Sequence, residues 1–394
     1  MLMRRHTRLA LTIVVAVMCG LSVVDGQEIS STESVQKPLL VGAYYYPWYR
    51  GAPREATADA PASVGWMRQA MRSHLVPQQL PALGVYDSAS PEVIAAHIAQ
   101  SRQANLDFWA VSWWGPNHST DRVLRRNILA HPAAEKLKYA ILYESTGRFG
   151  PFKSPDYSSL ASDFDYLEQQ FFNDPRYLKV DGKPVVFIYL TRVYFRNRGE
   201  DALRNLRLKH PNLYLIGDEV FGPRYPDDAA AAWDAITAYD VYGQSLQAAG
   251  ATQAAITQLK SNYEQAREAA HRSGKAFVPA ISPGYNDRAV RQGHEGRNRV
   301  FADKADSQEG DIFRAMLRQI ALPLADDAAQ RMVMVTSFNE WYEDSQIEPT
   351  QGTQPTTARD DSADGKFFTH DAAYVDYGDL YLRILREETT ATAP

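Results

Sequence analysis

Two glutamates near the carboxyl end of the chain have a spacing that suits acid–base chemistry on a sugar. Glu340 and Glu343 lie three positions apart in the stretch SFNEWYEDSQIEPT, residues 337–350. Three extended residues span about 10 Å at most, and a turn brings their side chains closer together. Both carboxylates can therefore face one bound sugar, and such pairs cleave glycosidic bonds in most glycoside hydrolases. The alternative is two surface acids on a solvated turn.

The elements that must position this pair recur along the chain. Eight apolar runs rich in strand-forming residues are visible. They cover residues 39–46, 106–113, 137–143, 184–190, 213–218, 235–241, 276–281 and 332–338. Stretches with helical character separate most of them. These cover residues 90–105, 120–130, 158–172, 201–209, 252–273, 310–322 and 373–387.

Eight buried strands with intervening helices predict an α/β fold, a (β/α)8 TIM barrel that forms a single catalytic domain. The first and last strands, containing Leu39 and Val335, should then be hydrogen-bonded neighbours. A doubly wound open sheet is the alternative, although no GxGxxG motif follows a predicted strand.

Polar and aromatic residues gather where the predicted strands end, which is where chemistry takes place in such barrels. Aromatic rings can form platforms for sugars, although any single one of them could equally pack inside the barrel. The candidate substrate-binding residues are Tyr46, Trp48, Trp113, Trp114, Glu144, Tyr189, Tyr242, Tyr285, Asn286, Arg288, Asn339 and Trp341. Six of them are expected to line one pocket together with the glutamate pair. These are Tyr46, Trp113, Glu144, Tyr189, Tyr242 and Tyr285.

Composition and missing motifs exclude several other function classes. The net charge is −5, from 42 Lys and Arg against 47 Asp and Glu, and no basic stripe indicates a nucleic acid partner. The histidines form no HxH or HExxH cluster, and Asp360, Asp361 and Asp364 lack the calcium-loop spacing. Neither a GxSxG motif nor a P-loop is present. We therefore expect no metal or cofactor, and an oligo- or polysaccharide as the partner.

The amino-terminal segment has the pattern of a secretory signal. Arg4, Arg5 and Arg8 precede an apolar run over residues 9–24. We expect a signal peptide at 1–26, a polar linker at 27–37 and the catalytic domain at 38–390, in a secreted or periplasmic protein without a transmembrane span in the mature chain. Lipid anchoring at Cys19, the only cysteine, is the less favoured alternative because Met18 fits a lipobox poorly.

The motif around the glutamate pair resembles the signature of glycoside hydrolase family 99, the endo-α-mannosidases, and of the wider family 99-like proteins. The segments VGAYYYPWYRG at 41–51, AVSWWG at 110–115 and DGKPVVFIY at 181–189 are also similar to that group, and the likeness covers most of residues 38–387. The resemblance implies a (β/α)8 barrel that hydrolyses bonds within an α-mannoside chain with retention of configuration. It places the chemistry on Glu340 and Glu343.

The resemblance also implies an unusual route through a 1,2-anhydro sugar. By analogy, Glu340 is the base that deprotonates the sugar's own 2-hydroxyl, which then attacks the anomeric carbon. Glu343 is the acid that protonates the leaving oxygen, and it then activates water.

One segment departs from the family pattern. The third strand of the family ends in His-x-Glu-Pro-Tyr, whereas residues 142–146 here read LYEST, so that only the glutamate, Glu144, is retained. Two alternatives to a secreted retaining endo-α-mannosidase therefore stay open. One is a family 99-like polysaccharide-processing enzyme with a different glycan substrate, and the other is a non-catalytic carbohydrate-binding barrel. The presence of both Glu340 and Glu343 argues against the second alternative.

Overall fold

The computed structural model describes residues 38–50, 79–222, 231–246, 250–287, 299–351 and 376–390. All of them belong to one compact unit, Lys37–Pro394. The predicted signal peptide, the linker, Cys19 and Arg288 lie outside the described residues. In the described part of the chain, no helix is both long and apolar enough to cross a membrane.

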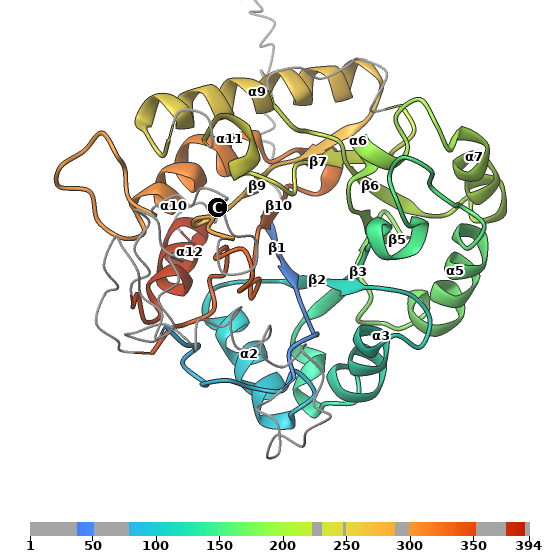
Figure 1. Cartoon of the computed structure of the whole chain (residues 1–394), viewed down its shortest axis with the longest axis horizontal. Helices are drawn as coiled ribbons and strands as arrows, with labels where there is room; N and C mark the ends of the chain where they lie inside the picture. Colours follow the sequence, from blue (N-terminus) through green and yellow to red (C-terminus); the bar gives the residue numbers. More distant parts are fainter. Residues whose placement is uncertain are drawn as a thin grey trace, which may run out of the picture. The chain divides into compact units, whose positions relative to one another are not determined.

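A ring of parallel strands forms the centre of the molecule (Figure 1). The described strands are β1 (Leu40–Tyr45), β2 (Phe108–Trp113), β3 (Lys138–Tyr143), β5 (Lys183–Ile188), β6 (Tyr214–Asp218), β7 (Ala235–Thr237), β8 (Ala276–Val278), β9 (Ala280–Ile281) and β10 (Met332–Val335). Their order is β8-β7-β6-β5-β3-β2-β1-β10-β9, and a short β4 (Lys179–Val180) pairs antiparallel with β5.

The ring closes because its two ends belong to the same stretch of chain. Only Pro279 separates β8 from β9, and β8 pairs with β7 whereas β9 pairs with β10. Proline lacks an N–H, but the carbonyl of Pro279 still accepts a hydrogen bond from the Met334 N–H at 2.9 Å. Because β8 and β9 together occupy one strand position, the described strands make a barrel with eight strand positions, which confirms the predicted (β/α)8 fold. The predicted neighbourhood of the first and last strands is also confirmed: Ala43 of β1 lies opposite Val335 of β10, and Leu39 precedes β1 by one residue.

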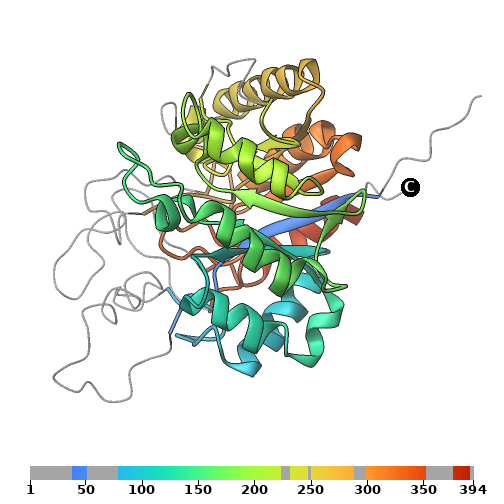
Figure 2. The ribbon, with the colours of Figure 1, turned by 90° about the vertical axis from the view of Figure 1, so that its right-hand side faces the viewer.

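Helices surround the barrel and match the predicted helical stretches. They are α2 (Pro91–Gln103), α3 (Ser119–Val123) continued by the π-helical η1 (Leu124–Ile128), α5 (Leu160–Leu167) continued by the π-helical η3 (Glu168–Phe172), α7 (Glu200–Lys209), α9 (Gln253–Arg272), α10 (Asp311–Met316) continued by the π-helical η5 (Leu317–Ala321) and by α11 (Leu322–Leu324), and α12 (Leu380–Thr390). Figure 2 shows this layer flanking the strands on both sides.

Short helical turns that the sequence analysis did not predict lie in the loops. They are η2 (Pro132–Lys136), α4 (Ser145–Phe149), α6 (Thr191–Tyr194), η4 (Tyr242–Leu246) and η6 (Asp327–Ala329). Two of them, α4 and α6, follow strands β3 and β5 directly and continue toward the mouth of the barrel. Segments of three to five residues are too short for a helical period to be visible in the sequence.

Local sequence signals explain where the longer helices begin. Helix α2 starts with Pro91 at its first position and has Glu92 in its first turn, where an acid favours the positive end of the helix dipole. In α9 the Thr252 hydroxyl accepts a hydrogen bond from the Ala255 N–H at 3.1 Å and so caps the helix.

Strand alternation divides side chains between the barrel interior and the helix layer. In β2, Phe108 points inward and its ring fills the space beside Gly42, where a Cβ would come within 2.1 Å of a ring carbon. The next residue, Trp109, points outward and donates from Nε1 to the Ser101 hydroxyl of α2 at 2.9 Å. The same alternation decides which side chains reach the mouth of the barrel.

Candidate active site

A cavity of about 320 Å³ opens at the carboxyl ends of the strands. This size lies at the lower end of the range for small-molecule sites. The residues that line it come from the ends of β1, β2, β3, β5, β7 and β10. They are Tyr46, Trp48, Trp114, Leu142, Glu144, Thr146, Tyr189, Tyr239, Glu340, Tyr342 and Glu343.

A turn directly after β10 presents both members of the glutamate pair to this cavity. Glu340 is buried, with 3% of its surface exposed, and its Oε1 accepts a hydrogen bond from the Tyr342 N–H at 2.9 Å. The Glu340 N–H donates to the Ser337 hydroxyl at 2.7 Å. The Glu343 carbonyl accepts from the Asn286 N–H at 2.7 Å. Hydrogen bonds on both sides of the turn therefore hold the backbone of both glutamates, and the Tyr342 N–H orients the Glu340 carboxylate.

Two tyrosines connect the first strand to Glu343. The Tyr46 and Tyr239 hydroxyls lie 2.5 Å apart, and the Tyr239 hydroxyl donates to Glu343 Oε2 at 3.4 Å. Burial, reinforced by nearby negative charge, raises the pKa of both tyrosines well above the usual value. Both hydroxyls therefore keep their protons and can act as hydrogen-bond donors to Glu343 or to a sugar oxygen.

A third glutamate, Glu144, lies at the end of β3. Its Oε1 accepts a hydrogen bond from the Ser112 hydroxyl at 2.6 Å, and this hydroxyl also accepts from the Trp114 indole N–H at 3.0 Å. Burial raises the pKa of Glu144 to about 8, and the negative charge of Glu343 acts in the same direction. Glu144 is therefore largely protonated at neutral pH, which limits the negative charge collected in the cavity.

Asp218, at the end of β6, fixes the wall formed by the neighbouring strands. Its carboxylate accepts hydrogen bonds from the Leu190 N–H at 3.0 Å and from the Tyr239 N–H at 3.0 Å, and it pairs with Arg192 at 2.5 Å. Leu190 follows Tyr189 and adopts a left-handed conformation with φ of 52°. Because Tyr189 and Tyr239 both line the cavity, one buried carboxylate holds two of its rings in place.

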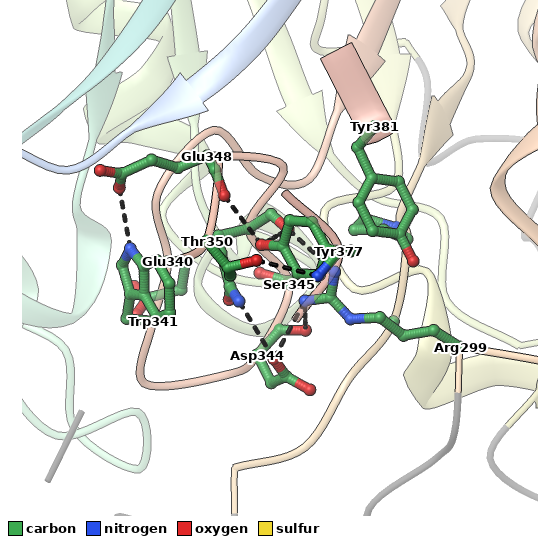
Figure 3. Close-up of polar contacts among 12 residues, drawn as sticks. Arg299, Glu340, Trp341, Asp344, Ser345, Glu348, Thr350, Tyr377 and Tyr381 are labelled. Carbon is green, nitrogen blue, oxygen red and sulfur yellow. Dashed lines mark hydrogen bonds and ion pairs between the residues drawn. The ribbon is translucent and has the colours of Figure 1, made fainter. Parts of the chain in front are cut away.

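Buried polar contacts also hold the loop that carries the glutamate pair on the side away from the cavity (Figure 3). Glu348 is fully buried and accepts from the Trp341 indole at 2.8 Å, from the Tyr86 hydroxyl at 2.9 Å and from His97, whose Nε2 lies 3.0 Å away. On the other side, the Arg299 guanidinium donates to the Asp344 carbonyl at 2.8 Å. Glu348 therefore stabilises the loop and does not line the cavity.

Five of the predicted substrate-binding residues line the cavity together with the pair. They are Tyr46, Trp48, Trp114, Glu144 and Tyr189. Contact with substrate stays a prediction for each of them, but the structure brings them to one site.

The prediction that Trp113, Tyr242 and Tyr285 line the same pocket is wrong. Trp113 points into the helix layer, where its indole donates to Asp121 at 3.0 Å; the alternation along β2 gives the inward position to Ser112 instead. The Tyr242 hydroxyl donates to the Pro283 carbonyl at 3.3 Å, and the Tyr285 hydroxyl donates to Asp287 at 2.9 Å. None of the three is among the described residues that line the cavity.

Three further predicted residues support the site from outside the cavity. Asn339 bonds the backbone of Tyr46 in both directions: its Oδ1 accepts from the Tyr46 N–H at 2.8 Å and its Nδ2 donates to the Tyr46 carbonyl at 3.1 Å. Trp341 contacts Glu348, and Asn286 contacts the backbone of Glu343. Asn339 and the backbone of Asn286 position residues that line the cavity, whereas Trp341 contacts the loop that carries the glutamate pair. None of the three is among the described residues that line the cavity, and substrate contact stays a prediction for them. Arg288 lies outside the described residues.

Four cavity residues were missing from the sequence prediction. They are Leu142, Thr146, Tyr239 and Tyr342. Tyr342 stands between the two glutamates in the motif, and Tyr239 lies near the end of the sixth predicted strand, 235–241, so both had a signal in the sequence. Leu142 and Thr146 flank Glu144 but carry no acid, base or ring that would mark them as candidates. In the described residues, no group of three or more His, Cys, Asp and Glu side chains could hold a metal ion.

Comparisons with known proteins agree with this geometry. A family model described as glycosyl hydrolase family 99 matches residues 43–380. The chain is 23% identical over 356 residues to the rat (Rattus norvegicus) glycoprotein endo-alpha-1,2-mannosidase, covering 82% of this chain and 70% of the relative. It is 25% identical over 342 residues to the human (Homo sapiens) glycoprotein endo-alpha-1,2-mannosidase-like protein, covering 78% of this chain and 67% of the relative.

A solved structure shares the fold. The GH99 endo-alpha-mannosidase from Bacteroides thetaiotaomicron aligns with a TM-score of 0.58 at 23% identity, covering 89% of this chain and 96% of that one. A solved glycoside hydrolase-like protein aligns with the same TM-score at 21% identity, covering 90% and 95% of the two chains. Because the family model spans most of the sequence, and both glutamates of the motif face one cavity, the chain belongs to glycosyl hydrolase family 99 and is a glycosidase.

Proposed function

We propose that this glycosidase cleaves α-mannosidic bonds within a glycan or mannan chain, with retention of configuration. The observation that carries the proposal is the joint exposure of Glu340 and Glu343 to one cavity walled by aromatic rings. The substrate class is supported by the rat and human relatives, which are named as an endo-alpha-1,2-mannosidase and an endo-alpha-1,2-mannosidase-like protein.

In the first step of the proposed reaction, Glu340 takes the proton from the 2-hydroxyl of the bound sugar. The freed electron pair on that oxygen forms a bond to the anomeric carbon, and the bond from this carbon to the leaving oxygen breaks. Glu343 gives its proton to the leaving oxygen. The product is a 1,2-anhydro sugar, with Glu340 protonated and Glu343 ionised.

In the second step, Glu343 takes a proton from water and the water oxygen attacks the anomeric carbon. The three-membered ring opens, and the 2-oxygen recovers its proton from Glu340. Two inversions at one carbon give net retention, and both glutamates return to their starting states. The Tyr239 hydroxyl, which donates to Glu343, stabilises the ionised form of this glutamate between the two steps.

The two glutamates should respond differently to removal of their acidity. Glu343→Gln should slow cleavage of substrates with poor leaving groups by about 10²–10⁴-fold, the usual contribution of a general acid, and should affect an activated aryl glycoside much less. Glu340→Gln should cleave both kinds of substrate slowly, because Glu340 assists attack at the anomeric carbon, which both kinds require. Kinetics of both variants on paired α-mannosides measure this, with Glu200→Gln as a control because Glu200 is an exposed acid on α7.

Two results would contradict the assigned roles. One is full activity of the Glu340 variant on both substrates. The other is a covalent ester between the sugar and either glutamate, because the proposed route forms its intermediate within the sugar. Resistance of a 2-deoxy substrate to cleavage would support the route, since that substrate lacks the internal nucleophile.

A different glycan substrate is the second candidate. It is favoured by one observation: Leu142 and Thr146, which replace the histidine and tyrosine of the family pattern at the end of β3, both line the cavity. Digestion of a glycan library followed by mass analysis of the products separates the candidates. Cleavage of α-mannosides supports the first, and cleavage confined to other glycans supports the second.

We also propose that the protein is exported with removal of its first 26 residues. The basic residues followed by the apolar run 9–24 support this proposal. The amino-terminal sequence of the protein purified from the extracellular or periplasmic fraction should begin near Gln27. A chain recovered there with Met1 intact would contradict the proposal.

A further inference from the structure

Two phenylalanines in the described part of the chain keep much of their surface exposed, Phe152 and Phe221. Phe221 follows β6 by three residues and keeps 44% of its surface accessible. Single exposed apolar residues are common on protein surfaces, so the exposure by itself assigns no role to this ring. The contacts of Phe221 distinguish it from Phe152, because they connect its ring to residues beside the cavity.

Contacts connect this ring to the wall of the cavity. The Arg192 guanidinium lies 4.7 Å from the centre of the Phe221 ring, and it pairs with Asp218 at 2.5 Å. Asp218 in turn accepts the Tyr239 N–H, and Tyr239 lines the cavity. Only two residues separate Arg192 from Tyr189, another lining residue. Phe221 does not line the cavity itself, but Arg192 and Asp218 connect it to the wall that contains Tyr189 and Tyr239.

Phe221 and Arg192 together offer the two kinds of contact that a sugar ring can make. A pyranose has an apolar face of C–H groups that packs on an aromatic ring, and hydroxyls at its edge that accept hydrogen bonds from a guanidinium. Arg192 is 11% exposed, and the pairing with Asp218 holds it in one orientation. The guanidinium therefore needs little reordering to meet a ligand.

We propose that Phe221 and Arg192 form a distal subsite that binds a neutral pyranose of the substrate chain beyond the sugars held in the cavity. The proposal rests on the proposed function, since it assumes a substrate with more than one sugar. It gives the enzyme a preference for longer chains, in which one additional sugar contacts the ring.

Binding to an inactive chain tests the subsite without requiring turnover. In the full chain carrying Glu340→Gln, calorimetric titration compares α-mannobiose with a longer linear α-manno-oligosaccharide. The longer ligand should bind more tightly, and adding Phe221→Ala should reduce its advantage over the disaccharide by about tenfold, the low end for loss of an apolar contact. Phe221→Trp should retain the advantage because it keeps a flat ring. Leu208→Ala, which changes an exposed apolar residue on α7, is the matched control.

The outcomes separate this inference from the proposed function. If the longer ligand keeps its full advantage in the Phe221→Ala chain, the subsite is wrong even though α-mannoside binding stands. If neither ligand binds the Glu340→Gln chain and the wild type cleaves no α-mannoside, the proposed substrate class fails and the subsite assignment fails with it. An equal loss in the Leu208→Ala chain would also overturn the assignment, because the effect would then not be local.

Discussion

The cavity holds three glutamates, Glu144, Glu340 and Glu343, in three different surroundings. Glu144 is buried beside a serine hydroxyl, Glu340 accepts a backbone N–H, and Glu343 is half-buried and meets a tyrosine hydroxyl. Because the three side chains are chemically identical, any difference in their roles comes from these surroundings. A carboxyl that stays neutral can donate a hydrogen bond to a sugar, whereas the other two exchange protons in the reaction that we propose.

The raised pKa of Glu144 predicts a specific pH dependence of stability. Between about pH 4.5 and about pH 8, Glu144 is neutral in the folded protein and ionised in the unfolded chain. The unfolded chain then binds fewer protons, so the free energy of unfolding decreases as pH rises through this window and levels off above it. Glu144→Gln, which is neutral at every pH, removes this contribution, on the order of a few kcal/mol.

Thermal unfolding of the wild type and the Glu144→Gln variant across this window measures the effect. The difference in Tm between them should move in favour of the variant as pH rises from about 4.5 to about 8. Histidines titrate in the same window in both proteins, so they cancel in the comparison. A Tm difference that does not change with pH would show that Glu144 is ionised in the folded state.

At the scale of elements, the loop after β10 depends on a contact from outside it. Arg299 donates to the carbonyls of Asp344 and Gln346, at 2.8 and 3.1 Å, and pairs with the Asp344 carboxylate at 3.0 Å. Its guanidinium lies 4.8 Å from the Tyr377 ring and 5.0 Å from the Tyr381 ring (Figure 3). Arg299 therefore connects α12 and the residues before it to the loop that carries Glu340 and Glu343. Glu343 adjoins Asp344, so its position depends on this contact.

Removal of Arg299 should therefore cost both stability and activity. Arg299→Ala leaves the buried Asp344 carboxylate without this partner, which typically costs about 3–5 kcal/mol. Arg299→Lys should recover part of that stability but little of the activity, because an ammonium cannot bond the carboxylate and both carbonyls as a guanidinium does. Urea unfolding and kcat on an α-mannoside measure the two effects.

Arg383→Ala is the matched control for this prediction, since Arg383 lies on α12, the helix that carries Tyr381, in an exposed pair with Asp379. Its loss should change stability by about 0.5 kcal/mol or less. Equal losses of stability and activity in the Arg299 and Arg383 variants would mean that the contact of Arg299 with the loop after β10 does not cause them.

At the scale of the whole molecule, rings from several strands fill the interior of the barrel. The Phe108 and Phe187 rings lie 6.2 Å apart, and the Tyr44 ring lies 5.8 Å from Phe187. Phe108 has room because Gly42 on the neighbouring strand lacks a side chain. The cavity lies above this packed layer, so the same strands provide the core below and the site above.

Gly42→Ala should destabilise the barrel even though alanine normally favours folding over glycine. The added Cβ would lie 2.1 to 2.5 Å from three carbons of the buried Phe108 ring. Overpacking of this kind costs roughly 1–3 kcal/mol, more than the gain from reduced chain entropy. Phe108→Leu in the Gly42→Ala background should restore part of the loss. Unfolding of the two single variants and the double variant measures the coupling; strict additivity would contradict a direct clash.

Part of this structure was predictable because its signals are local. The apolar runs that became β1, β2 and β10, and the longer helices such as α9, carry their period within a dozen residues. The motif around Glu340 and Glu343 is likewise one continuous segment, so the pair was identified before its surroundings were known. Phe221 gave no such signal, because a lone aromatic residue after a strand is common.

The sequence by itself determined the barrel, its strand positions and the choice of Glu340 and Glu343 as the candidate pair, whereas only the tertiary structure decided which side chains surround the pair. Trp113 and Trp114 are adjacent and chemically alike, and the direction of each depends on the phase of β2 against its neighbours, where a shift of one residue exchanges them. The hydrogen bond from Arg299 to Asp344 joins residues 45 positions apart in the sequence, and the one from the Tyr239 N–H to Asp218 joins residues 21 positions apart. No local pattern records such contacts, because they exist only once the ring of strands has closed and brought distant loops to the same mouth.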